Sequence, residues 1–95
     1  MITKENIIEE LKKIQDPELG IDIWTLGLIY QINIIDQAKV HLLITFTSPM
    51  CPAGGLIISK IQENLKDMGF KTVDVEVTFD PAWQPSEELR TALGI

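Results

Sequence analysis

The fold is decided by the stretch Thr47-Ser48-Pro49-Met50-Cys51-Pro52-Ala53-Gly54, which joins a strand pattern to a helical pattern. In residues 40–47, apolar side chains alternate with more polar ones, and this period predicts a strand with one apolar face. From about Ala53 to Met68, apolar residues recur at helical spacing, and Gly69 is placed to end that helix. The quoted stretch is therefore predicted to be a loop between a strand and a helix.

The only cysteine of the chain, Cys51, lies in this loop, one residue before a proline. Pro52 suits the first turn of a helix, because the N–H that proline lacks has no partner there. Cys51 is then at or beside the N-cap, where unpaired N–H groups and the helix dipole favour the thiolate, the nucleophilic and metal-binding form. A free cysteine is also often a small buried hydrophobic residue, and position alone does not separate the two interpretations.

The other elements follow from the same kind of pattern. Thr3 is a suitable N-cap for a first helix, and Asp16-Pro17 is expected to stop it, because the residue before a proline avoids the helical region. The expected elements are a helix at 4–14, strands at 28–35 and 72–79, and a short helix capped by Ser86 and ended by Gly94.

This order, α-β-β-α-β-α, predicts one α+β domain over residues 1–95 with two layers. Each helix has a single apolar stripe, so the helices are expected on the apolar face of a three-stranded mixed sheet. The first two strands form an antiparallel hairpin, and the crossover through the second helix makes the third strand parallel to the second. We expect those two strands to pair directly, and we expect His41 on the face away from the core.

Composition and charge narrow the classes of partner. Fourteen acidic residues against eight basic ones give a formal net charge of −6, and the basic residues are scattered along the chain. Nucleic-acid and anionic-membrane binding both draw on clustered Lys and Arg, so we expect neither. A single cysteine cannot form an internal disulfide, and the N-terminus does not have the pattern of a signal peptide, so we expect a cytoplasmic protein.

Three polar loops are expected to meet at one end of the sheet. The second and third strands both end there, and the loop before the antiparallel first strand reaches the same end. The alternative for the acidic loop is a helix-terminating turn with two solvated acids, and Trp83 either closes the core or contacts a partner. The residues brought to this end are Asp16 and Glu18, Thr47, Ser48 and Cys51, and Asp80 with Trp83.

Most enzymes would need residues that this chain lacks. It has no glycine-rich phosphate loop, and its one histidine, His41, is predicted at the opposite end of its strand from Cys51. We therefore expect no enzymatic activity. One thiolate also cannot complete a four-thiolate iron–sulfur or zinc site. Further ligands would come from a second copy of the chain, a partner protein, a small thiol or the nearby carboxylates.

Several separated motifs resemble the metal–sulfur cluster assembly factor family, which includes SufT and PaaD. In that resemblance Asp16 and Glu18 match an acidic loop, Thr47 and Ser48 a hydroxyl turn, and Cys51 a reactive cysteine. It implies a fold similar to the C-terminal domain of NifU-type scaffold proteins. The matching motifs are Asp16-Pro17-Glu18, Leu26-Gly27-Leu28-Ile29-Tyr30, Thr47-Ser48-Pro49-Met50-Cys51-Pro52, Pro81-Ala82-Trp83 and Leu93-Gly94.

The resemblance implies a factor for iron–sulfur cluster assembly or transfer that helps mature client apoproteins. Two departures limit it: the extra C-terminal cysteines of longer relatives are absent, and the scaffold proteins' Cys-x-x-Cys pair is reduced to Cys51. A transient cluster, held with other assembly proteins, a client or in a homodimer, then fits better than stable binding by a monomer. The alternatives are an adaptor that recruits clients through the Leu19–Leu26 loop with Trp24 and through Trp83, and a small thiol enzyme.

Overall fold

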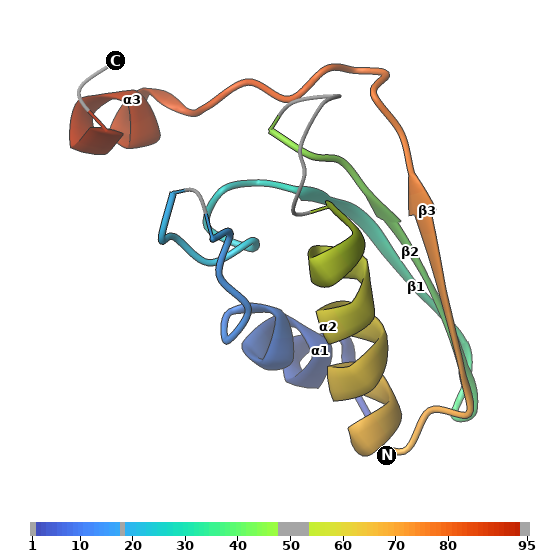
Figure 1. Ribbon diagram of the computed structural model, residues 1–95. Coiled ribbons are helices and arrows are strands. Elements are labelled where there is room, and N and C mark those ends of the chain that lie inside the picture. The colour runs from blue at the N-terminus through green and yellow to red at the C-terminus, as the bar shows by residue number, and fades with distance from the viewer. Residues whose placement is uncertain (1, 18, 48–53, 94–95) are drawn as a thin grey trace.

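The helices and strands follow one another in the predicted order, in a computed structural model that describes residues 2–17, 19–47 and 54–93 (Figure 1). The predicted α+β class is confirmed. The elements are α1 (Lys4–Leu11), β1 (Ile29–Asp36), β2 (Lys39–Ile44), α2 (Gly54–Asp67), β3 (Thr72–Val77) and α3 (Glu87–Leu93).

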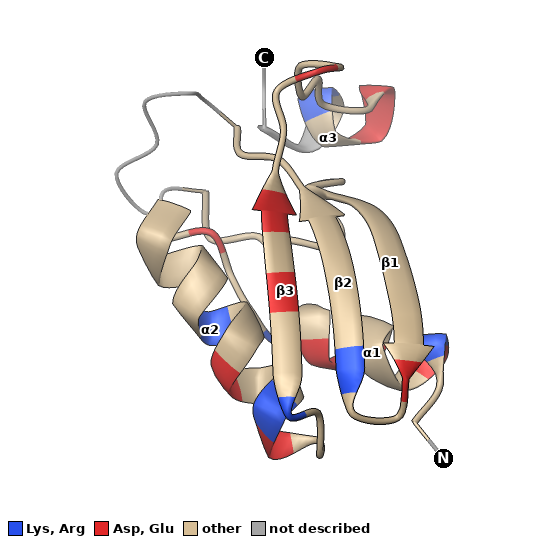
Figure 2. Cartoon of the chain, turned by 90° about the vertical axis from the view of Figure 1, so that its right-hand side faces the viewer, with Lys and Arg blue, Asp and Glu red and all other residues tan. Residues whose placement is uncertain are grey.

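The three strands form one mixed sheet in the order β1-β2-β3 (Figure 2). β1 pairs with β2 antiparallel, and β2 pairs with β3 parallel from Lys39 opposite Thr72 to Ile44 opposite Val77. The expected direct pairing of β2 with β3 is therefore confirmed. Since β2 lies in the middle, β1 and β3 are both edge strands.

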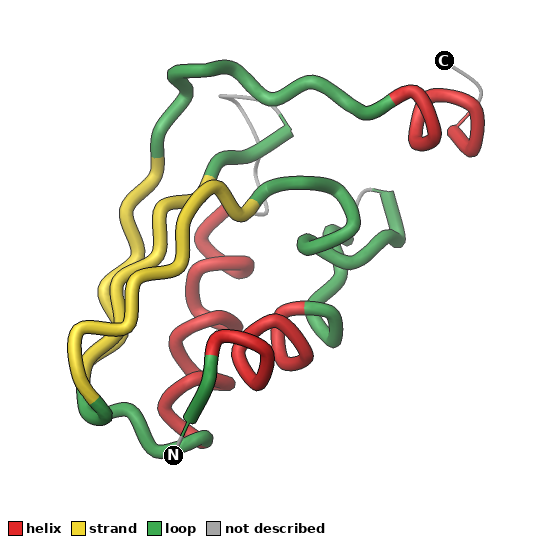
Figure 3. Tube along the Cα trace, turned by 180° about the vertical axis from the view of Figure 1, so that it is seen from behind, coloured by secondary structure: helices red, strands yellow, loops and turns green. Residues whose placement is uncertain are grey.

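The core lies between one face of the sheet and the helices α1 and α2, which both cover that face (Figure 3). From β2 the alternate residues Val40, Leu42 and Ile44 are buried, as the period of two predicts. The helices contribute their apolar stripes. The fully buried helical side chains are Ile7 and Leu11 of α1 and Ile57, Ile61 and Leu65 of α2.

α1, β2 and β3 each end two or more residues earlier than predicted. α1 ends at Leu11 instead of residue 14, because the Lys13 and Ile14 amides donate to carbonyls three residues back, which tightens the last turn. Ile14 is still buried, so the prediction that it faces the core is confirmed, whereas the prediction that it belongs to the helix is wrong. β2 and β3 likewise stop at Ile44 and Val77, before the predicted residues 47 and 79.

The pairing of β1 with β2 contains a bulge. Ile29 lies opposite Ile44 and Gln31 opposite Leu43, so that Tyr30 is an extra residue in β1. The strict alternation predicted for residues 28–35 is therefore wrong at this point. Ile29 packs against the core, and the ring of Tyr30 lies on the outer face, where its hydroxyl donates to the Pro81 carbonyl at 2.8 Å.

The segment after β3 crosses the end of the sheet before it reaches α3 (Figure 1). It contains a cis peptide bond between Asp80 and Pro81. The predicted cap of α3 is confirmed, because the Ser86 hydroxyl accepts a hydrogen bond from the Leu89 amide. Leu89 is buried with the core residues. Among the described residues, no helix has the length and apolar character needed to span a bilayer.

Candidate functional site

The predicted meeting of loops at one end of the sheet is observed for the parts that the structure describes. The Thr45 amide donates to the Leu28 carbonyl and the Thr78 amide to the Ile44 carbonyl, which places the ends of β2 and β3 beside the start of β1. Phe46 and Phe79 lie two residues beyond those strand ends, and their ring centroids are 6.2 Å apart. This end of the sheet therefore gathers the loops that carry the predicted site.

Three of the predicted site residues, Cys51, Ser48 and Glu18, lie outside the described residues. Thr47 is described and is half-buried where the chain leaves the sheet. On the other side of the cysteine segment, α2 begins at Gly54. The described residues that flank the cysteine segment are therefore Thr47 and Gly54, and both lie near the core.

Phe46 and Gly54 fix these two ends relative to each other. Gly54 is buried, and a Cβ atom built on it would lie 2.8 Å from Cε2 and 2.9 Å from Cζ of Phe46. The Phe46 ring therefore packs directly on the backbone at the first residue of α2. One signal in the sequence could have indicated this contact: two glycines stand at the start of a helix, where glycine is unfavourable unless close approach requires it.

Asp16 is a fully buried carboxylate within the loop that precedes β1. Its Oδ1 accepts a hydrogen bond from the Leu19 amide, its backbone carbonyl accepts from Gly20, and its amide donates to the Ile21 carbonyl. The alternative of two solvated acids is therefore wrong for Asp16. These contacts make it the residue around which its loop is folded.

The loop around Asp16 is packed down as its apolar content predicted. Ile23 and Leu26 are buried, and the amides of Ile23 and Leu28 both donate to carbonyls within residues 14–28. Gly20 and Gly27 have positive φ angles of 69° and 78°, which glycine adopts without strain. The loop therefore contributes to the core, and most of its apolar surface is not available to a partner.

Trp83 joins the segment after β3 to this same loop. Its indole Nε1 donates to the Leu26 carbonyl at 2.6 Å, and its ring is half-buried against the core. Trp24 is also half-buried and packs against the core from the loop before β1. Of the two interpretations of Trp83, the geometry favours the one in which it closes the core.

Thr45 is a second buried polar residue at this end. Its side chain is fully buried, and its hydroxyl has no hydrogen-bond partner within the described residues. His41, by contrast, lies where it was predicted, on the outer face of β2, and its Nε2 is 3.4 Å from Glu76 Oε1 and 3.8 Å from Asp74 Oδ2. Its neighbours are thus the acids of β3, the strand on which Figure 2 marks two acidic positions in red.

Within the described ranges, no group of three His, Cys, Asp or Glu side chains is placed to hold a metal ion. A cluster or metal at this end of the sheet would therefore depend on Cys51. The chemistry of that donor is suitable, since cysteine thiolates are the usual ligands of iron–sulfur clusters. The single cysteine supplies only one such ligand, so the remaining ligands would have to be other residues of this chain or groups of another molecule.

The chain is similar over most of its length to proteins of iron–sulfur protein maturation. Residues 4–79 match the family described as "Iron-sulfur cluster assembly protein". The chain is 35% identical over 96 residues to "Fe-S protein maturation auxiliary factor YitW" of Bacillus subtilis, covering 97% of this chain and 94% of that protein. It is also 28% identical over 95 residues to an "Iron-sulfur cluster carrier protein" of Synechocystis, covering 99% of this chain and 27% of that protein.

The fold is shared with a solved structure, "Conserved Hypothetical Protein TM0487 from Thermotoga maritima". The two superpose with a TM-score of 0.85 and are 47% identical, over 99% of this chain and 96% of that one. The element order and sheet described above are therefore those of an experimentally observed fold.

Proposed function

Because this chain belongs to the iron–sulfur cluster assembly protein family, we propose that it carries a labile iron–sulfur cluster on Cys51 and passes it to client apoproteins. The role in iron–sulfur protein maturation is the one that the family and the Bacillus subtilis relative carry in their descriptions. The name of the Synechocystis relative supports the finer proposal of a carrier. The observation that carries the proposal is that the family match spans the only cysteine.

The proposed chemistry is ligand exchange, without a catalytic residue. Cys51 gives up its proton and binds one iron as a thiolate, while thiolates of a second copy, a client or a small thiol occupy the remaining positions. Transfer occurs when a client thiolate replaces Cys51 on that iron and Cys51 takes up a proton again. No electrons are exchanged, so the step needs no oxidant or reductant.

The packing around the cysteine segment supports such a carrier. The Phe46 ring on Gly54 holds the start of α2 against the end of β2, and the buried Asp16 and the Trp83 hydrogen bond hold the neighbouring loops. A cluster ligand needs a positioned donor, and a carrier needs that donor at an accessible edge of the fold.

Anaerobic reconstitution with iron and sulfide tests the proposal. We expect absorption bands of a cluster in the wild-type chain with a thiol present, and their loss in Cys51→Ser. Met50→Leu is the matched control, because it changes the neighbouring sulfur of the same segment and keeps the thiol. The loaded chain should also activate a purified apo-ferredoxin. If neither the wild-type chain nor its mixture with apo-ferredoxin binds iron, the carrier proposal is wrong.

An adaptor that recruits clients without touching the cluster is the second candidate. It is favoured by three exposed apolar side chains, Leu19, Leu56 and Phe79, which are 36%, 54% and 41% exposed. If this function is correct, purified Cys51→Ser retains client binding in pull-downs and the reconstitution fails. Loss of clients together with the thiol would contradict it.

A further inference from the structure

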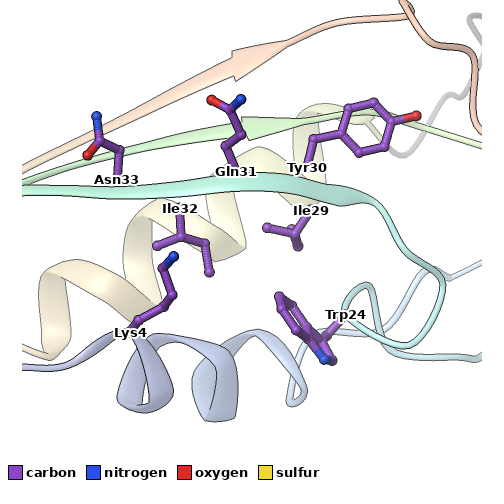
Figure 4. A pocket seen from close by; sticks show the side chains of 7 residues that line it. All are labelled: Lys4, Trp24, Ile29, Tyr30, Gln31, Ile32 and Asn33. Carbon is purple, nitrogen blue, oxygen red and sulfur yellow. The ribbon is translucent and has the colours of Figure 1, made fainter.

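A groove runs between helix α1 and the edge strand β1, from the start of β1 to its middle. It has a volume of about 340 Å³ and is lined by residues 29–33 of β1, by Trp24 and by Lys4. Figure 4 shows that the side chains of Ile29 and Ile32 point from β1 toward Trp24 and Lys4 on the opposite wall. The groove therefore has three apolar side chains, Ile29, Ile32 and Trp24, within an otherwise polar lining beside an edge strand.

The strand that forms this wall has an unused side. β1 pairs with β2 alone in the sheet, and in the described part of the chain no other strand lies along its outer edge. In an antiparallel pair, every second residue directs its N–H and C=O away from the partner strand. β1 therefore offers a row of backbone donors and acceptors beside the groove, which is the arrangement that proteins use to bind an added strand.

The charge in the groove favours a particular kind of partner. Lys4 is the only charged residue that lines it, and among the described residues no carboxylate lies within salt-bridge distance of its ammonium group. The chain as a whole has a net charge of −6, whereas the one charge among the described residues of the groove wall is positive. A peptide with one carboxylate at the Lys4 end of the groove would complement it.

We propose that this groove binds an extended peptide segment of another protein, which adds to the sheet as a fourth strand beside β1. Its backbone pairs with the free edge of β1, alternate apolar side chains enter the groove between Ile29, Ile32 and Trp24, and an acidic side chain pairs with Lys4. The proposal does not depend on the cluster chemistry of Cys51, and it gives client recognition a surface separate from the cysteine segment.

A second copy of this chain is a poorer occupant than a foreign peptide. β1 of a second copy would bring the sequence of residues 29–36, in which Asp36 is the only acid. The carboxylate of Asp36 already accepts a hydrogen bond from the Ala38 amide at 2.7 Å, where it stabilises the hairpin turn. Pairing through β1 of both copies would therefore leave Lys4 without a carboxylate partner.

The probe is a phage-displayed library of random linear peptides about ten residues long, the upper length of a typical strand. Selection on the full chain is expected to enrich peptides with alternating apolar residues and an acid toward one end. Bound to the ¹⁵N-labelled chain, a selected peptide should shift the amide signals of residues 29–33 and the Trp24 indole signal. Hydrogen exchange of alternate β1 amides should slow, which side-chain contact alone would not cause.

Two exposed lysines provide matched variants. Lys4→Glu should weaken the selected peptide at least about tenfold, as expected for loss of a charge-assisted contact. Lys60→Glu makes the same change in net charge on α2, outside this groove, and should bind as the wild type does. Lys4 is the first residue of α1, where an acid suits the helix dipole, so the variant is expected to fold. A peptide N-methylated at its pairing amides should lose binding.

Several results would overturn the proposal. The proposal is wrong if the selected peptides shift amide signals outside residues 29–33 and Trp24. It is also wrong if they bind the Lys4→Glu variant and the wild type with equal affinity. A further such result is a wild-type chain whose measured mass is that of a dimer, with β1 amides protected in the absence of peptide, because the occupant would then be a second copy. Iron loading measured in parallel should be the same in Lys4→Glu as in wild type, so failure here is distinguishable from failure of the carrier proposal.

Discussion

Trp83 fastens the C-terminal segment to the loop before β1 through one hydrogen bond to a buried carbonyl. Its indole Nε1 lies 2.6 Å from the oxygen of Leu26, a residue that is 1% exposed. We predict that Trp83→Phe lowers the free energy of unfolding, because phenylalanine keeps most of the aromatic packing but lacks the N–H. The Leu26 carbonyl would then stay buried without this donor.

The size of the effect follows from that unsatisfied acceptor. Leaving a buried polar group without its partner costs about 1–3 kcal/mol. The smaller ring adds a loss of apolar contact, which is limited because Trp83 is only half-buried. Domains of this kind are stable by about 5–15 kcal/mol, so a change of this size is a measurable part of the total.

Urea denaturation followed by far-UV circular dichroism measures it, and Trp24→Phe is the matched control. Trp24 is also half-buried against the core, and its indole makes no hydrogen bond within the described residues. The same substitution there removes similar ring area without removing a bond. We expect Trp83→Phe to be less stable than Trp24→Phe by about 1 kcal/mol or more. If the two agree within about 0.5 kcal/mol, the bond does not hold the segment, and the partner-contact interpretation of Trp83 regains support.

Three further substitutions, one of them a control, test the packing beside the cysteine segment. Gly54→Ala should lower the free energy of unfolding by about 1–3 kcal/mol, because its Cβ would lie 2.8 Å from the Phe46 ring. Gly55→Ala, where nothing lies within 4 Å, should be neutral or stabilising by up to about 1 kcal/mol in the same urea titration, and equal effects at both positions would contradict the contact. Thr45→Val should raise stability by about 1 kcal/mol, since it removes a buried hydroxyl that has no partner among the described residues; a loss of stability would show that the hydroxyl is satisfied.

The order and topology of the elements could be predicted because they depend on periodicity and connection length. Alternation at 40–47 and 72–79, and helical spacing at 53–68, fixed which faces are apolar, and the crossover rule fixed the parallel pair. The meeting of loops at one end of the sheet followed from this topology. These predictions need only the periodicity of the side chains and the lengths of the connections, both of which can be read from the sequence.

The state of the individual site residues could not be predicted in the same way. Asp16 reads as a solvated acid at a helix end, and only the packed apolar residues around it explain why it is buried and accepts the Leu19 amide. The contact of Phe46 with Gly54 likewise depends on where a ring from one element meets the backbone of another. These are long-range consequences of packing, which a linear pattern does not contain.

The bulge at Tyr30 is the clearest feature that the sequence pattern does not predict. It affects both the groove along β1 and the segment after β3. A strict period of two would place Tyr30 toward the core and Ile29 outward. The extra residue reverses both: Ile29 enters the groove beside α1, and the Tyr30 hydroxyl reaches the Pro81 carbonyl. One inserted residue therefore both shapes the edge groove and ties β1 to the segment that carries Trp83. Because that segment crosses the end of the sheet that gathers the site loops, the bulge links the strand that forms the groove wall to an element at that end.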